Sequence, residues 1–122
     1  MADYLTFILV DFDNTICVFK EDFKCETMVP GAKEGIARLR EAGYKVTIHS
    51  ARNNVIYGGH IGTPYKLMVD FLEREGIEYD RLDCGRYGKP IGYMHIDDKS
   101  VGCPLTKDGY VDWKEVCKLL EV

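Results

Sequence analysis

The fold is decided by an apolar run that ends in two carboxylates, Leu5-Thr6-Phe7-Ile8-Leu9-Val10-Asp11-Phe12-Asp13-Asn14-Thr15. A run this rich in β-branched and aromatic residues is typical of a strand that is buried on both faces of a sheet. Open α/β sheets bind their ligands at the carboxyl ends of the strands. The run therefore predicts a central strand that delivers Asp11 and Asp13 to a functional site. The alternative is an acidic turn of ordinary Asp-Asn chemistry, without any function.

The composition is that of a soluble globular protein. The chain has 122 residues, of which 46% are hydrophobic and 30% are charged, so we expect one domain that spans residues 1–122. The net charge of −4 disfavours nucleic acid as a partner, and no apolar run approaches the roughly 20 residues that cross a bilayer. The five cysteines include no Cys-x-x-Cys pair, which favours reduced thiols and a cytoplasmic location.

Helices and strands are expected to alternate after the first run. The patterns predict strands at 44–49, 77–82 and 93–96 and helices at 32–42, 63–75 and 113–120. The last helix should bury Val116, Leu119 and Leu120. Residues 16–29 indicate a small hairpin or flap beside the site. This order predicts an α/β fold: a single-domain, Rossmann-like parallel sheet with helices on both faces.

Polar residues fall just after the predicted strands or in the loops beside them. They comprise four acids, one hydroxyl and one ammonium: Asp11, Asp13, Ser50, Lys89, Asp97 and Asp98. Because parallel strands end at the same edge of a sheet, we expect these groups to converge on one site. A turn or a solvated loop would explain each residue singly, but chance placement of the whole set is much harder to accept.

The ordered set resembles the haloacid dehalogenase (HAD) superfamily, in its phosphatase branch. Residues 11–15 match the first motif of that family, Asp-x-Asp-x-Thr, and Ser50 matches the second. Lys89 matches the third motif and Asp97-Asp98 the fourth. The resemblance spans residues 5–98 and implies a HAD-like core. The connecting segments are too short for the cap that larger members carry, so we expect a small flap and no cap domain.

The resemblance implies a role for each matched residue. Asp11 would be the nucleophile that forms an aspartyl-phosphate, and Asp13 would be the general acid and base. Lys89 would offset negative charge, and Ser50 would hydrogen-bond a phosphoryl oxygen. The implied cofactor is Mg²⁺, held directly by Asp11, the backbone carbonyl of Asp13 and Asp97, with Asp98 acting through a bound water or from beyond the direct ligands.

Three further residues are assigned to the substrate side of the site. The backbone N–H of Phe12 would bind a phosphoryl oxygen, and Thr15 would brace the loop. Arg52, in a loop at the edge of the site, would contact the substrate, and the alternative is a role at the surface alone. We expect His49 to be structural and Tyr57 to serve packing rather than stacking on a ligand.

The predicted function is that of a Mg²⁺-dependent phosphatase, which hydrolyses the phosphomonoester of a sugar or of another small metabolite. The alternative substrate is a phosphorylated polymer or nucleic-acid end, and the alternative function is a catalytically silent phosphate- or Mg²⁺-binding module. A response-regulator receiver domain would carry its acidic pair before the phosphorylated aspartate, the reverse of the order found here. Because an uncapped site is open to water, we expect either a large substrate or a second subunit of a homo-oligomer to cover it.

Overall fold

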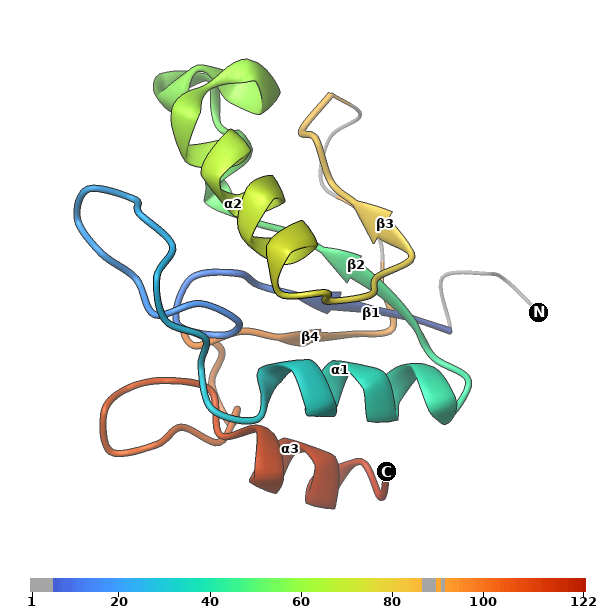
Figure 1. The fold of residues 1–122 in the computed structure, drawn as a ribbon. Coiled ribbons are helices and arrows are strands. Elements are labelled where there is room, and N and C mark those ends of the chain that lie inside the picture. The colour runs from blue at the N-terminus through green and yellow to red at the C-terminus, as the bar shows by residue number, and fades with distance from the viewer. Residues whose placement is uncertain (1–5, 87–89, 91) are drawn as a thin grey trace.

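A computed structural model describes residues 6–86, 90 and 92–122. Its centre is a sheet of four parallel strands in the order β3-β2-β1-β4 (Figure 1). The strands are β1 (Phe7–Val10), β2 (Lys45–Ile48), β3 (Arg81–Leu82) and β4 (Met94–Ile96). The third predicted motif, Lys89, lies outside the described residues.

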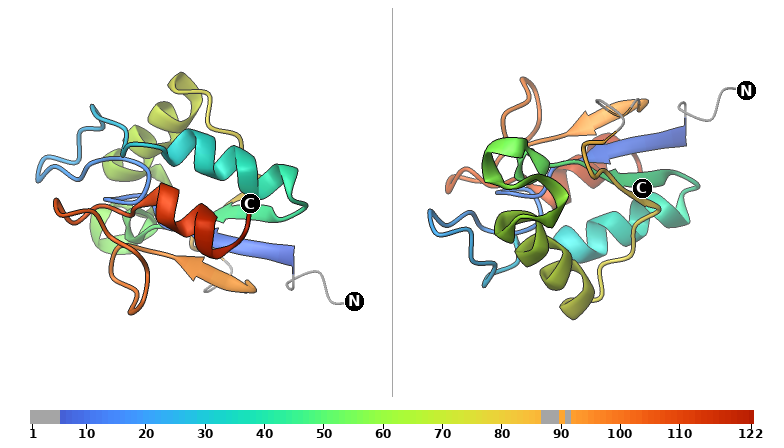
Figure 2. Two further views of the ribbon diagram at one scale, coloured as in Figure 1. Left: turned by 90° about the horizontal axis from the view of Figure 1, so that it is seen from below. Right: turned by 90° about the horizontal axis from the view of Figure 1, so that it is seen from above.

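Helices cover both faces of this sheet. Helix α2 (Thr63–Arg74) lies on one face, whereas α1 (Ala32–Glu41) and α3 (Trp113–Leu119) lie together on the other (Figures 1 and 2). The α/β class, the parallel sheet and the coverage of both faces are therefore confirmed. None of the helices in the described part of the chain is long and apolar enough to cross a membrane.

The apolar run that opens the chain forms the centre of the core. All residues of β1 are buried, because β2 and β4 flank the strand and the helices cover its two faces. Burial on this scale is the main stabilising contribution to the fold. The order of the strands therefore follows from the most apolar segment taking the most enclosed position.

Helix α3 packs against α1 through a large aromatic side chain. A Cβ atom on Gly35 would come within 2.4 Å of the Trp113 ring, so only glycine allows this close approach. The Trp113 indole also donates a hydrogen bond to the Thr15 carbonyl at 2.7 Å. The prediction for this helix was partly wrong: Leu119 is 68% exposed, whereas Trp113 and Cys117 are buried. The buried stripe of the helix comprises Trp113, Val116 and Cys117, with Leu120 partly buried, so the prediction holds for Val116, and Leu119 lies off the stripe.

The predicted third strand is also shorter than expected. Only Arg81–Leu82 pairs with β2, although the pattern extended over residues 77–82. The reason is Asp80, whose N–H donates to the Val46 carbonyl at 2.9 Å and whose carboxylate accepts from the Val46 N–H at 2.8 Å. A side chain thus takes the place of the next backbone partner in the ladder.

Two loops lie beyond the carboxyl ends of the strands. In the first, at residues 18–27, the two legs meet through a hydrogen bond from the Val18 N–H to the Thr27 carbonyl at 2.8 Å. This confirms a small flap. The second loop joins β2 to α2 through three short 3-10 turns, which the sequence did not predict: η2 (Ala51–Asn53), η3 (Val55–Tyr57) and η4 (Gly59–Ile61).

Candidate active site

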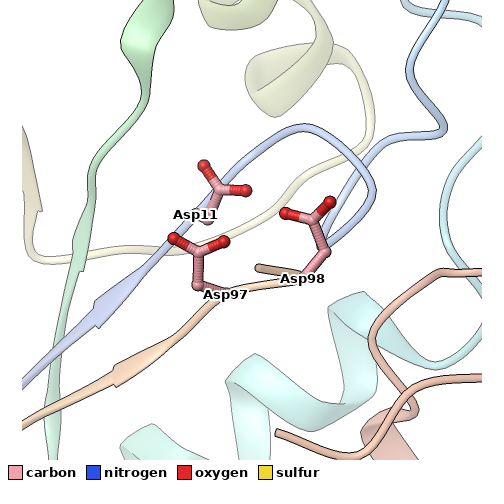
Figure 3. Close-up of side chains that lie close together, drawn as sticks. All are labelled: Asp11, Asp97 and Asp98. Atoms are coloured by element: carbon pink, nitrogen blue, oxygen red, sulfur yellow. The ribbon is translucent and has the colours of Figure 1, made fainter. Parts of the chain in front are cut away.

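Three of the predicted acids meet at the carboxyl ends of β1 and β4. Val10 is paired with Ile96, and the Asp11 N–H donates to the Ile96 carbonyl at 3.0 Å. This register brings Asp11 beside Asp97 and Asp98, with their carboxylate groups gathered in one place (Figure 3). One oxygen atom from each of the three carboxylates lies within 4.8 Å of the other two. The strand register, set by apolar pairing, therefore assembles the acidic cluster.

The three carboxylates oppose one another's charge. Burial raises the pKa of Asp11 to about 8, and the negative charge of Asp97 and a hydrogen bond with Asp98 add to the rise. Burial and a hydrogen bond with Asp97 also raise the pKa of Asp98. Oxygen donors crowded in this way suit a hard divalent cation, which would relieve the repulsion. Asp11, Asp97 and Asp98 are therefore the residues that could hold Mg²⁺.

Asp13 is held apart from this cluster by an arginine. Arg52 donates to the Asp13 carboxylate from Nη2 at 2.7 Å and from Nε at 3.0 Å. The Arg52 side chain is only 1% exposed, and its Nη1 donates to the carbonyls of Phe23 and Pro64. The sequence predicted a contact between Arg52 and the substrate. In the structure, its main partner is the predicted general acid.

Thr15 and Phe12 shape the loop that carries the two acids. The Thr15 hydroxyl donates to Asp11 Oδ2 at 3.3 Å, which agrees with the predicted bracing role. The Phe12 ring is fully buried against Phe71, so only its backbone faces the acids. That backbone N–H makes a hydrogen bond with the Asp11 carboxylate. Both residues therefore fix the position of Asp11.

Ser50 lies at the end of β2, where the sequence placed it. Its Oγ accepts a hydrogen bond from the Arg52 N–H at 3.2 Å, which caps the turn η2. It also lines a cavity of about 400 Å³ together with Asp11, Asp13, Asp97 and Asp98. The structure thus brings together five of the six polar residues that follow the predicted strands.

Sequence reasoning gave no role in the site to three polar residues that line this cavity, namely Asn14, His49 and Lys99. His49 lines it, and its Nδ1 lies 2.8 Å from Asp83 Oδ2. Asp83 is itself fixed by the Asn53 amide at 3.1 Å and by the Gly85 N–H at 3.0 Å. Lys99 also lines the cavity, and its N–H donates to Asp97 Oδ1 at 2.9 Å. The available signal was position: His49 directly precedes Ser50, and Lys99 directly follows the acidic pair.

Aromatic side chains form another part of the lining. Phe19 and Phe23 come from the flap, and Tyr57 comes from η3. Tyr57 was expected to serve packing rather than stacking on a ligand; its ring packs edge-to-face on Phe23, and it also lines the cavity. The cavity is therefore lined by a cluster of carboxylates on one side and by aromatic rings on another.

Two solved structures are similar to this chain. A conserved protein from Bacteroides thetaiotaomicron aligns with a TM-score of 0.67 and 20% identity, over 94% of this chain and 88% of that one. An MCSG target from Vibrio cholerae aligns with a TM-score of 0.55 and 21% identity, over 95% of this chain and 97% of that one. At such low identity the likeness shows the fold alone. No protein-family model and no curated protein sequence matches the chain.

Proposed function

We propose that this protein is a Mg²⁺-dependent phosphatase that hydrolyses phosphomonoesters through an aspartyl-phosphate on Asp11. The observation that carries the proposal is the cluster of Asp11, Asp97 and Asp98, assembled at the end of a parallel sheet and opening into a cavity. The arrangement agrees with the resemblance of the sequence to the HAD superfamily, and we propose membership of that family.

The donor set of the cluster fits Mg²⁺, and Asp11, Asp97 and Asp98 would hold it. When bound, the metal would offset the negative charge that the carboxylates and a phosphate ester bring to the same place. The carboxylate form of Asp11, which a nucleophile needs, would also be favoured. Lys99 lines the same cavity and would add positive charge.

The protein's own residues account for the bonds that change. An Asp11 oxygen attacks phosphorus, the bond from phosphorus to the ester oxygen breaks, and Asp13 gives a proton to the departing alcohol. Water then attacks the phosphorus of the aspartyl-phosphate and returns a proton to Asp13, which releases inorganic phosphate and restores Asp11. Thr15 and the Phe12 N–H hold the Asp11 carboxylate, while Arg52 holds Asp13.

The cysteines support a cytoplasmic location as part of this proposal. All five are free thiols, of which Cys17, Cys25 and Cys117 are buried. Free thiols persist in a reducing compartment.

The test is an assay of phosphate release with Mg²⁺, over sugar phosphates, nucleotides, aryl phosphates and phosphorylated oligonucleotides. We expect release that is abolished by chelation of the metal and by Asp11→Asn. A folded wild-type protein that binds Mg²⁺ but releases no phosphate from any of them would contradict the proposal and favour a silent binding module.

A further inference from the structure

Three aromatic rings form a continuous side of the cavity, which we call the aromatic wall: Phe19, Phe23 and Tyr57. Phe23 is the central ring. Its centroid lies 5.8 Å from that of Phe19 and 5.1 Å from that of Tyr57, both in edge-to-face arrangements. Phe19 is 40% exposed and Tyr57 37% exposed, so ring surface remains accessible beside the acids. The wall joins the flap to η3 and closes one side of the site.

The aromatic wall is fastened to the residues proposed to carry the chemistry. Arg52, which binds Asp13, also donates to the Phe23 carbonyl at 2.9 Å, and its guanidinium lies 5.2 Å from the centroid of the Phe23 ring. The Phe19 N–H donates at 2.9 Å to the side chain of Asn14, which follows Asp13 in the chain. The wall therefore has a fixed place relative to the acids.

Phe23 adopts a backbone conformation that a phenylalanine rarely takes. Its φ is +64°, in the left-handed region where a Cβ atom is crowded and glycine is favoured. The hydrogen bond from Arg52 and a bond from the Phe23 N–H to the Lys20 carbonyl hold it there. Backbone strain of this kind is concentrated at functional sites. Here the unusual conformation places a ring in the cavity, which glycine would not do.

The two sides of the cavity would bind different parts of one ligand. The acids, Ser50 and His49 provide polar groups, whereas Phe19 and Phe23 provide apolar ring surface without hydrogen-bonding groups. A sugar could present only its C–H face to those rings, and its hydroxyls would gain no hydrogen bonds from Phe19 or Phe23. A flat aromatic group would pack against them in an offset-stacked or edge-to-face arrangement, the geometries that aromatic pairs prefer.

We propose that the substrate is a phosphomonoester whose leaving group is a planar aromatic ring, such as an aryl phosphate. This inference rests on the proposed phosphatase function and narrows its substrate class. In this arrangement the phosphate lies at Asp11, and the ring lies against the aromatic wall.

The test compares the binding of two non-hydrolysable ligands that differ only in the ring, phenylphosphonate and cyclohexylphosphonate. Calorimetry with Mg²⁺ present should show that phenylphosphonate binds about 2- to 10-fold more tightly, the range expected for an aromatic pair. Tyr57→Leu and Phe23→Leu should each bring this ratio toward one. Tyr57→Leu is informative even where Phe23→Leu destabilises the flap, since Tyr57 is more than one-third exposed.

Tyr93→Leu is the matched control. Tyr93 is 54% exposed and does not line the cavity, so this variant should keep the wild-type ratio. Equal affinities in the wild type, or a preference that survives both wall substitutions, would overturn the inference. Phosphate release without ring preference would leave the phosphatase proposal intact and remove this one. Ring preference without phosphate release from any ester would overturn both proposals, because the inferred substrate class rests on phosphatase activity, and would leave the aromatic wall as a ring-binding surface only.

Discussion

Acidic side chains at the two ends of the sheet have neighbours of differing charge: an arginine at the amino end and other carboxylates at the carboxyl end. At the amino end, Arg40 bonds Asp80 at 3.2 Å and Glu78 at 2.8 Å, and the hydrogen bond from Arg40 lowers the pKa of Asp80. At the carboxyl end, Asp11 lies with Asp97 and Asp98, and its pKa is raised to about 8. None of the ion pairs among the described residues involves any of these three carboxylates.

The contrast separates a structural use of acids from a functional one. Asp80 and Glu78 have their cation within the chain, so their charge fastens α1 to the segment that leads into β3. Among the residues that the structure describes, no ion pair involves the acidic cluster, and its carboxylates disfavour one another's ionisation, a condition that is concentrated at functional sites. The simplest reason for it is a cation supplied from solution.

The largest effect should follow from a change in the acidic cluster. Asp11→Asn keeps the size of the side chain but removes the nucleophile, so phosphate release should fall on the order of 1,000-fold or more. Asp80→Asn makes the same chemical change at the other end of the sheet and should leave the rate unaltered. Steady-state rates of the two variants measure the difference. Comparable losses in both would break the distinction between the two ends.

The next effect concerns the ion pair that borders the cluster. Arg52→Ala should lower the free energy of unfolding by about 3 kcal/mol, because it leaves Asp13 and two carbonyls without their donor. Arg52→Lys keeps the charge but not the paired geometry and should lose less stability. Urea unfolding of both variants gives the comparison. A loss below 1 kcal/mol in Arg52→Ala would contradict the assigned anchoring role.

The pH dependence of metal binding should sharpen the same comparison. Folding raises the pKa of Asp11 from 3.8 to about 8. The contribution of this group to the free energy of unfolding is therefore full below pH 3.8 and is lost as the pH rises through about 8. Mg²⁺ should reverse that loss, because it competes with the proton. The melting temperature should therefore gain more from MgCl₂ at pH 8.5 than at pH 6. An equal gain at both values would contradict the assignment of Asp11 as a ligand.

The smallest effect should come from the amino end. The lowered pKa of Asp80 gives a stabilising contribution that is present above its ordinary pKa and is lost as pH falls through the lower folded value. Asp80→Asn should therefore reduce the melting temperature at pH 7 less than Arg52→Ala does. In acid, the melting temperatures of the wild type and of Asp80→Asn should converge. Thermal melts from pH 7 to pH 2 measure this. A constant gap across that range would show that the Arg40 pair is not the cause.

Much of the fold was predictable because the local signals agree. The apolar run of β1 and the Thr63-Pro64 start of α2 each give the position of an element to within a residue or two. The convergence of Asp11 with Asp97 also followed from the sequence, because parallel strands end at one edge of the sheet.

The features that the sequence did not predict depend on contacts between residues that are far apart in the chain. Arg52 and Asp13 are 39 positions apart, and no local pattern marks them as partners. His49 and Asp83 are 34 positions apart, so the strand pattern around His49 could not show its place at the cavity. Likewise, the strand pattern before Arg81 could not show that the Asp80 side chain would end the ladder.

The most direct test is calorimetric titration of the protein with Mg²⁺ at pH 8, in the wild type, Asp97→Asn and Asp80→Asn. The acidic cluster is expected to bind one Mg²⁺ per chain in the wild type and in Asp80→Asn, with binding at least about tenfold weaker in Asp97→Asn. A folded wild-type protein that binds no Mg²⁺, or an Asp97→Asn variant that binds it as tightly as the wild type does, would contradict the assignment of this edge of the sheet as a metal centre.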